Sequence, residues 1–159
     1  MLNTQTNKHA SPPTLLVVDD NETVLELLDL LLSHHGSTVV RAKNGSQCLD
    51  IVQRRPVDLV ILDVMMPGMD GIQVSAELKR VSPALPIILL TAKDDLATRA
   101  AAMALGVNEF VTKPINNRDL LTRVRTHIAS RRWQMEMERT AASVARLSET
   151  HGVKIEGKA

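Results

Sequence analysis

The fold of this chain is decided by the stretch Val57-Asp-Leu-Val-Ile-Leu-Asp-Val-Met-Met-Pro-Gly-Met-Asp-Gly71. It opens with an uninterrupted apolar run, Leu59 to Leu62, which is typical of a strand buried on both faces of a parallel sheet. The run ends on the carboxylate of Asp63 and then breaks into a loop with Pro67 and Gly68. An acid there lies at the carboxyl edge of the sheet, where open α/β folds place their functional groups. The competing interpretation is that Asp63 merely caps the following helix or solvates the end of the strand.

The composition describes one domain with an aliphatic core. The chain has 159 residues, of which 44% are hydrophobic and only 1% aromatic. A net charge of +1 gives no electrostatic reason to expect a nucleic-acid or membrane partner. The single cysteine, Cys48, excludes an internal disulfide framework and fits a reduced cytosolic location. Residues 1–13 lack the apolar core of a signal peptide, and the longest apolar runs are too short to cross a bilayer. We therefore expect a cytoplasmic protein with no direct nucleic-acid or membrane contact.

Strand-like runs alternate with helical patterns along most of the chain. The expected strands cover residues 14–18, 37–42, 58–62, 86–91 and 108–112. Each is followed by apolar residues at helical spacing, as with Leu25, Leu28 and Leu32 after the first strand. Strict alternation of this kind predicts an α/β fold, a five-stranded parallel sheet with helices on both faces and right-handed crossovers.

Polar side chains follow four of the five expected strands and converge on one edge of the sheet. They are Asp19 and Asp20, Asp63, Thr91, and Lys113. Three crowded carboxylates repel one another, and a hard divalent cation such as Mg²⁺ relieves that repulsion. With a lysine and a hydroxyl beside them, they suit transfer of a phosphoryl group to Asp63. Each residue alone has an ordinary explanation as a cap, a strand end or a loop cation, but their joint placement is hard to obtain by accident.

Four motifs contribute to this edge: Val17-Val-Asp-Asp-Asn21, Leu62-Asp-Val-Met-Met-Pro-Gly-Met-Asp-Gly71, Leu90-Thr-Ala92 and Phe110-Val-Thr-Lys-Pro114. Together they resemble the receiver domain of two-component response regulators. They occur in the family's order and spacing, and the resemblance covers about residues 14–130. It implies a flavodoxin-like strand order of 2-1-3-4-5. It also implies a signalling protein that catalyses only its own phosphorylation and dephosphorylation.

The resemblance assigns a role to each polar residue. Asp63 would be the phosphoacceptor and would receive its phosphoryl group from a sensor histidine kinase or a phosphotransfer protein. Asp20 and Asp63 would bind Mg²⁺ directly, Asp19 mainly through water, and Met65 through its backbone carbonyl. Lys113 would contact the phosphoryl group.

The resemblance also implies a switch. Thr91 would swing toward the phosphoryl oxygen, and Phe110 would turn inward into the vacated space. Phe110 has no hydroxyl, so an inward state would rest on packing alone. The face formed by the fourth helix, the fifth strand and the last helix would then change its pairing with an effector domain or protein.

The last helix is expected to extend beyond the domain. Residues 118–149 contain neither proline nor glycine, and at ~1.5 Å per residue they would form a rod of roughly 48 Å. Alternating steps of four and three join Trp133, Met137, Thr140, Val144 and Leu147. Such steps are typical of a coiled-coil seam, here about two heptads long, and favour a homodimer over a frayed tail. The phase does not continue from Val124 and Ile128, so the register shifts near Ser130.

These patterns divide the chain into four segments. We expect a disordered tail over 1–13, a receiver over 14–130, a helical extension and possible coiled coil over 131–150, and a disordered tail over 151–159. The basic stretch from Arg123 to Arg132 is interpreted as a solvated helix face rather than a DNA contact. No effector domain is recognisable, so the chain is a single-domain regulator or the N-terminal part of a longer one.

Two other functions compete with the phosphorylation switch. An aspartyl-phosphate phosphatase of the haloacid-dehalogenase kind places a second aspartate two residues after its nucleophile, and Met65 at that position counts strongly against it. The other alternative is a phosphorylation-independent, dimerising interaction module held together by its helix. The intact acidic pocket argues against that module, and a measurement of phosphorylation decides.

Overall fold

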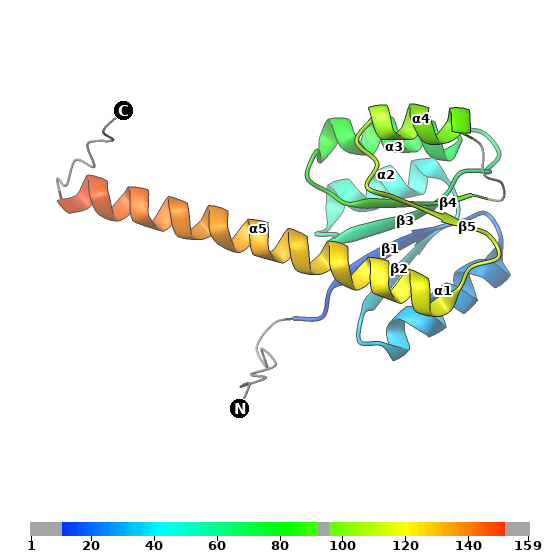
Figure 1. The fold of residues 1–159 in the computed structure, drawn as a ribbon, viewed down its shortest axis with the longest axis horizontal. Helices are drawn as coiled ribbons and strands as arrows, with labels where there is room; N and C mark the ends of the chain where they lie inside the picture. Colours follow the sequence, from blue (N-terminus) through cyan, green and yellow to red (C-terminus); the bar gives the residue numbers. More distant parts are fainter. Residues whose placement is uncertain (1–10, 92–95, 152–159) are drawn as a thin grey trace.

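The computed structural model describes residues 11–91 and 96–151. Strands and helices alternate, and the last helix projects far beyond the rest (Figure 1). The strands are β1 (Thr14–Val18), β2 (Thr38–Ala42), β3 (Leu59–Asp63), β4 (Ile87–Thr91) and β5 (Glu109–Thr112). The helices are α1 (Glu22–His34), α2 (Gly45–Arg54), α3 (Gly71–Val81), α4 (Leu96–Ala104) and α5 (Asn117–His151). The tails predicted to be disordered lie outside the described residues, except that residues 11–13 lead into β1 and His151 ends α5.

The five strands form one parallel sheet in the order β2-β1-β3-β4-β5. The predicted sheet order is confirmed, and each strand lies within one residue of its predicted bounds. β3 and β4 are buried at every position because they are interior strands with helices on both faces. The edge strands β2 and β5 carry exposed positions instead. Asp63 pairs with Leu90 and Thr91 with Thr112, so the strands end almost level at one rim.

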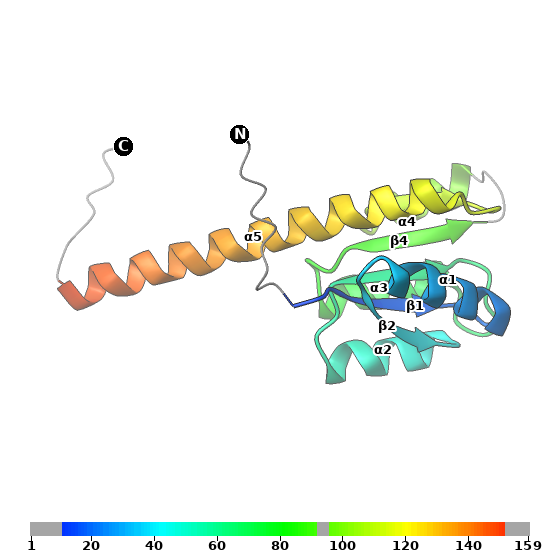
Figure 2. The same ribbon diagram turned by 90° about the horizontal axis from the view of Figure 1, so that it is seen from below.

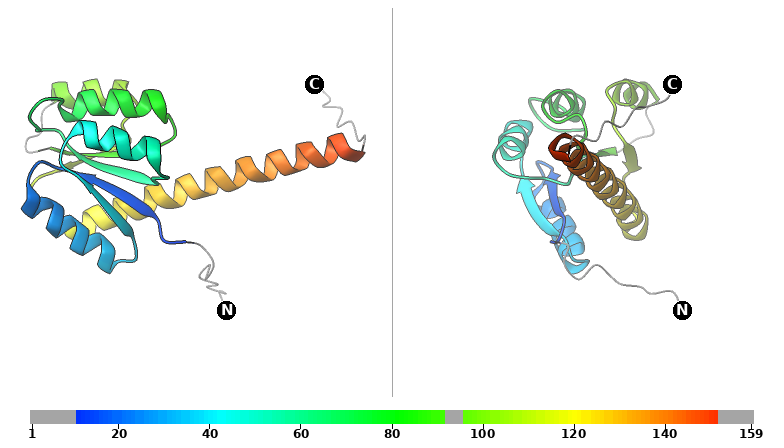
Figure 3. Two further views of the ribbon diagram at one scale, coloured as in Figure 1. Left: turned by 180° about the vertical axis from the view of Figure 1, so that it is seen from behind. Right: turned by 90° about the vertical axis from the view of Figure 1, so that its left-hand side faces the viewer.

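Helices cover the two faces of the sheet unequally. Helices α2, α3 and α4 lie on one face, and α1 and α5 on the other (Figures 1 and 3). Successive strand residues point to opposite faces, so Leu16 and Val18 pack under the first group while Leu15 and Val17 pack under the second. On the second face the helices contribute Leu25, Leu28 and Leu32 of α1 and Leu120, Val124 and Ile128 of α5.

The helix caps are supplied by residues other than the acids at the strand ends. Asn21 caps α1, its side-chain oxygen accepting from the amides of Thr23 and Val24. Asp70 caps α3 in a reciprocal capping box with Gln73. The capping interpretation of Asp63 is therefore wrong, and Asp63 is left available at the rim.

Helix α5 carries two apolar stripes on opposite faces. Val124 and Ile128 are buried against the sheet, whereas Trp133 is 66% exposed. Trp133 lies nine residues after Val124, which is two and a half helical turns and therefore the other side of the helix. The predicted shift of register near Ser130 corresponds to this change of face, since the helix itself is unbroken. Figure 2 shows α5 running past the end of the sheet.

Within the described residues, no helix combines the length and the apolar character that a membrane span needs.

Candidate functional site

The carboxyl ends of β1, β3, β4 and β5 bring the predicted polar residues together at one rim. Asp19 follows β1, Asp63 and Thr91 end β3 and β4, and Lys113 follows β5. A carboxylate oxygen of Asp19, of Asp20 and of Asp63 all lie within 4.8 Å of one another. Parallel strands that end level place these side chains side by side although they lie far apart in sequence.

Two of the three acids are buried. Asp19 and Asp63 have almost no exposed surface, and Asp20 faces solvent. Burial raises the pKa of the Asp19 carboxyl above its ordinary value, and the neighbouring carboxylates of Asp63 and Asp20 raise it further. The backbone amide of Asn21 and the charge of Lys113 act in the opposite direction. Negative charge is therefore costly at this rim, and a cation would relieve the cost.

Lys113 supplies part of the missing positive charge. Its Nζ lies 3.3 Å from Oδ2 of Asp63 and 3.6 Å from Oδ2 of Asp19. The amide of Lys113 donates to the carbonyl of Thr91 at 2.7 Å, which ties the residue to the end of β4. The peptide bond between Lys113 and Pro114 is cis. One lysine cannot neutralise three carboxylates.

The donor set fits a hard divalent cation. All the converging ligand atoms are carboxylate oxygens, which Mg²⁺ and Ca²⁺ prefer. Asp19 Oδ2 is buried and accepts no hydrogen bond within the described residues, although Lys113 lies near it. A buried carboxylate oxygen without a donor is costly unless another positive group meets it. The acidic cluster is thus compatible with a metal site.

Thr91 presents a second buried polar atom. Its Oγ1 has no hydrogen-bond partner among the residues that the structure describes, and the side chain is buried at the end of β4. Hydroxyls in this situation normally find an acceptor. The Thr91 hydroxyl is therefore a free donor beside the acids.

Met65 contributes its main chain rather than its side chain. Its amide donates to Asp63 Oδ1 at 3.2 Å, while its side chain is 72% exposed. This arrangement keeps the loop after β3 against the phosphoacceptor candidate. The family resemblance implies a metal contact through the carbonyl of Met65, and the structure adds this contact of its amide.

Gly71 is a site residue whose role the sequence did not reveal. A Cβ at Gly71 would lie 2.6 Å from the carbonyl oxygen of Asp63 and 2.6 Å from Cα of Val64. The Gly71 amide donates to the carbonyl of Val64 at 3.0 Å, so the loop after Asp63 closes back on itself. The only sequence signal was a glycine at the start of the helix after the acidic loop.

Phe110 lies outside the acidic cluster. It is half-buried on β5 beside Leu89 and packs toward the α4 face of the sheet. The guanidinium carbon of Arg99, on α4, lies 5.6 Å from the centre of the Phe110 ring. Sequence reasoning missed Arg99, since nothing in the pattern of an Ala-rich helix marks this arginine.

The comparisons with known proteins agree with this geometry. The sequence profile of the response regulator receiver domain matches residues 15–125. The probable transcriptional regulatory protein TcrX of Mycobacterium tuberculosis is 38% identical over 114 residues, covering 72% of this chain and 49% of TcrX. The transcriptional regulatory protein GlrR of Escherichia coli is 44% identical over 105 residues, covering 66% of this chain and 24% of GlrR. The chain thus spans about half or less of the length of these curated relatives.

Solved structures show the same similarity. A putative response regulator from Chloroflexus aurantiacus superposes with a TM-score of 0.70 at 36% identity, covering 74% of this chain and 98% of that chain. The match to the sequence profile includes all four rim segments and ends at residue 125, before the projecting part of α5. Proteins of this family are signalling modules rather than classical enzymes. The chain therefore belongs to the receiver domain family of two-component response regulators.

Proposed function

We propose that Asp63 accepts a phosphoryl group from the phosphohistidine of a sensor histidine kinase or phosphotransfer protein, with Mg²⁺ held by Asp19, Asp20, Asp63 and the carbonyl of Met65. One observation carries the proposal. The buried Asp63 carboxylate lies 3.3 Å from Lys113 Nζ and within 4.8 Å of two further acids. A nucleophilic carboxylate with a lysine and oxygen ligands around it suits phosphoryl transfer.

The two oxygens of Asp63 have different surroundings. Oδ1 accepts the Met65 amide, whereas Oδ2 faces Lys113. Oδ2 is therefore the attacking atom: its bond to phosphorus forms as the bond from phosphorus to the donor imidazole nitrogen breaks, and that nitrogen takes up a proton. Lys113 pairs with the negative charge on the transferred group. Mg²⁺, when bound, would neutralise charge on the equatorial oxygens.

Phosphorylation would be read out through β4 and β5. The free hydroxyl of Thr91 would donate to a phosphoryl oxygen, and Phe110 would turn into the space that Thr91 leaves. The surface formed by α4, β5 and α5 would then change its fit to an effector. Since the curated relatives are two to four times longer than the matched segment, we place this chain within a longer cytoplasmic regulator.

The phosphodonor would dock beside α1. An apolar groove of about 700 Å³ lies between α1 and the residues after β5, and Lys113 is among the residues that line it. Leu27 and Leu30 line the groove while remaining 62% and 71% exposed. Exposed leucines in a groove favour contact with an apolar helix face. A partner helix seated there would hold its phosphohistidine near Asp63.

The extension of α5 would pair with a second copy of the chain. Its exposed seam consists of Trp133, Met137, Thr140, Val144 and Leu147. Because α5 is continuous, Ser130 and Thr126 precede Trp133 on the same face at the same alternating steps. The apolar part of the seam spans about two heptads, since Thr126 and Ser130 are polar. Val144 and Leu147 line a hollow that also includes Thr14 and Asp58 at the end of the receiver. The charged residues of the extension lie mainly on other faces, which leaves the seam free for a partner helix.

Phosphorylation is tested by intact mass after incubation with Mg²⁺ and acetyl phosphate. The wild type should gain one phosphoryl group, and Asp63→Asn or omission of Mg²⁺ should abolish the gain. Asp50→Asn makes the same chemical change at an exposed acid of α2 and should behave as the wild type. Turnover of the donor that is independent of Asp63 would contradict the proposal.

The alternative of a phosphorylation-independent module is tested on the same samples by light scattering. A dimer of the same size and affinity in phosphorylated and unphosphorylated protein would favour that alternative for the extension. A change of either on phosphorylation would connect the extension to the site. Docking is tested by Leu30→Glu, which should slow transfer from a kinase but leave labelling by acetyl phosphate unchanged.

A further inference from the structure

The candidate switch residues Thr91 and Phe110 share one face of the sheet. β4 and β5 pair so that Leu89 lies beside Phe110 and Thr91 beside Thr112. Alternate residues of a strand point the same way, so all four side chains face α4. Phe110 indeed packs against the core cluster that includes Leu89 and Ala102 of α4. Whatever α4 presents to this face therefore acts on Phe110.

Arg99 is the residue of α4 that meets this part of β5. Its guanidinium carbon lies 5.6 Å from the centre of the Phe110 ring, within the range of a cation–π interaction. The same side chain donates from a terminal nitrogen to Oγ1 of Thr112 at 3.4 Å. Arg99 thus contacts two residues of β5 at once, and the second of them directly precedes Lys113.

The contact stabilises one position of the ring. Phe110 has no hydroxyl, so no hydrogen bond of its own holds the ring in the half-buried position. The attraction of a planar guanidinium for the ring face requires that the ring stay below Arg99. A ring turned inward toward Thr91 would lose this contact.

We propose that Arg99 is a positioning residue that holds Phe110 in its half-buried position and so opposes the inward turn that accompanies phosphorylation. The inference rests on the proposed function of Asp63. A surface cation–π contact changes such an equilibrium by about two- to fivefold. Arg99 thereby sets how strongly the unphosphorylated chain favours its resting state.

The chain offers a selective probe, because Phe110 is its only phenylalanine. Phenylalanine labelled with ¹³C in the ring gives one set of aromatic signals, all from Phe110. These signals are recorded in the full chain before and after addition of beryllofluoride and Mg²⁺, a mimic of the phosphoryl group on an aspartate. In the wild type, the two spectra define the resting and the loaded positions of the ring.

Three variants separate the contributions of Arg99. Arg99→Met keeps the length of the side chain and removes its charge, and its resting signals should shift toward the loaded position. Its affinity for beryllofluoride should rise about two- to fivefold. Arg99→Lys keeps a cation and should restore part of the wild-type behaviour. Arg125→Met removes an exposed arginine of α5 and should leave both readouts unchanged.

The outcomes distinguish this inference from the proposed function. The role of Arg99 would be overturned if Arg99→Met had the same resting Phe110 signals and the same affinity for beryllofluoride as the wild type. A wild type that takes up no beryllofluoride would overturn the role of Asp63. In that case the Phe110 signals recorded without beryllofluoride would still test the contact. Signals in Arg99→Met that equal those of the wild type would show that Arg99 does not position the ring. A thermal unfolding midpoint within a few degrees of the wild type shows that the variant is folded.

Discussion

The two halves of α5 are made of similar residues but are stabilised in different ways. From Asn117 to Ser130 the helix lies along the sheet (Figure 3) and buries Leu120, Val124 and Ile128 in the core. From Arg131 onward it projects, and its apolar side chains are exposed on the opposite face. The first half is held by its own domain, and the second half leaves most of its large apolar side chains exposed.

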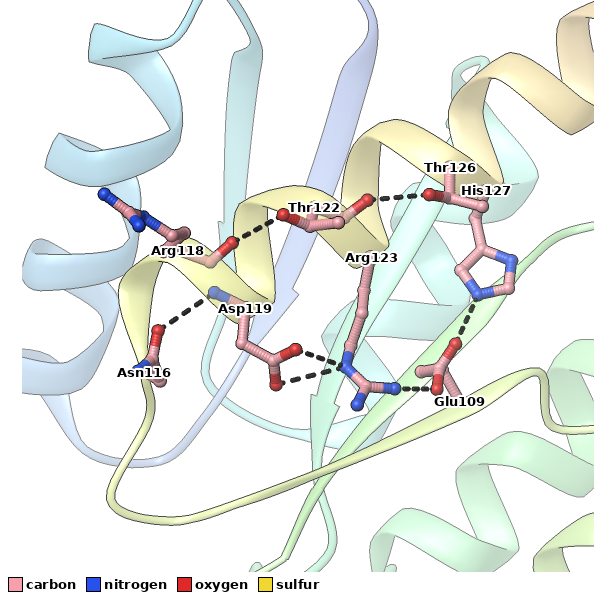
Figure 4. Close-up of polar contacts among 8 residues, drawn as sticks. All are labelled: Glu109, Asn116, Arg118, Asp119, Thr122, Arg123, Thr126 and His127. Carbon is pink, nitrogen blue, oxygen red and sulfur yellow. Dashed lines mark hydrogen bonds and ion pairs between the residues drawn. The ribbon is translucent and has the colours of Figure 1, made fainter.

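The polar contacts of α5 follow the same division. In the first half, Arg123 forms ion pairs with Asp119 and Glu109, and His127 bonds Glu109, which fastens the helix to β5 (Figure 4). The hydroxyls of Thr122 and Thr126 donate to carbonyls of their own helix, so these two donors need no hydrogen-bond partner from another element. A helix in a protein gains most of its stability from packing its apolar face against the rest of the fold. The difference indicates that the first half is stabilised by the receiver, and we expect the extension to depend on pairing for its stability.

The largest expected effect tests this separation with one residue type. Leu120→Ala removes a fully buried side chain and should lower the free energy of unfolding by about 2–5 kcal/mol. Leu147→Ala, at a side chain that is 59% exposed, should change it by less than about 0.5 kcal/mol at concentrations where the chain is monomeric. Urea unfolding followed by circular dichroism measures both. Similar losses in the two variants would show that the extension is part of the receiver's fold.

The second prediction concerns association. Val144→Asp places a charge in the seam and should weaken self-association by about tenfold or more, since pairing would bury an unpaired carboxylate. Ala145→Asp adds the same charge at the next residue, a third of a turn away and off the seam, and should have little effect. Sedimentation equilibrium measures both dissociation constants. Equal weakening by the two variants would place the contact surface elsewhere on the helix.

The third prediction is an effect confined to the receiver. The folded state raises the pKa of Asp19, so the ionised carboxylate is disfavoured there. The stability that the protonated Asp19 carboxyl contributes is fully present below the ordinary aspartate pKa. It is lost as the pH rises through the higher pKa that Asp19 has in the folded state. In chelator, Asp19→Asn should therefore stabilise the chain at neutral pH by roughly 1 kcal/mol.

Mg²⁺ provides the matched test of the same acids. The metal should raise the unfolding midpoint of the wild type and raise that of Asp19→Asn less. The fluorescence of Trp133, the only tryptophan, reports on the extension and should not respond to Mg²⁺ in the monomer. If Asp19→Asn in chelator is no more stable than the wild type, the three acids do not repel one another enough to destabilise the fold.

The sequence predicted the sheet and its rim because both depend on local patterns. Apolar runs that end on Asp19, Asp63 and Thr91 determine which residues reach the carboxyl edge once the strands are parallel. Assignments that require the relative placement of two segments were not accessible. The close approach of Gly71 to the Asp63 carbonyl and the position of Arg99 over Phe110 both depend on how helices pack on strands.

The same limit applies to α5 and to the caps. The sequence showed two sets of apolar residues whose helical spacing does not match. The structure shows that the helix is unbroken, so the two sets lie on two faces of one helix. Likewise, Asp19 and Asn21 both suit a helix cap by residue type. The backbone geometry decides that Asn21 fills that role, which leaves Asp19 for the rim.

The smallest expected effect lies at the junction of the two halves. Arg131 donates to the carbonyl of Ala84 and Arg132 to that of Ser11, each at 2.6 Å, and these contacts fix the direction in which the extension leaves. Replacing both with alanine should cost less than about 1 kcal/mol, because exposed contacts contribute little. Burial and, to a smaller extent, the charge of Arg131 lower the pKa of Lys79, so removing Arg131 also relieves a repulsion and reduces the cost.

The change should instead appear as motion of the extension. Trp133 follows the two arginines directly, so its fluorescence anisotropy in the monomer should fall when they are replaced. Arg139→Ala together with Arg146→Ala removes two exposed arginines farther along the helix and should leave the anisotropy unchanged. If the junction variant keeps the wild-type anisotropy, the direction of the extension is fixed by the continuous helix alone. The receiver and the extension would then move as one rigid body, and a change at β5 could reach the paired helices without passing through these side-chain contacts.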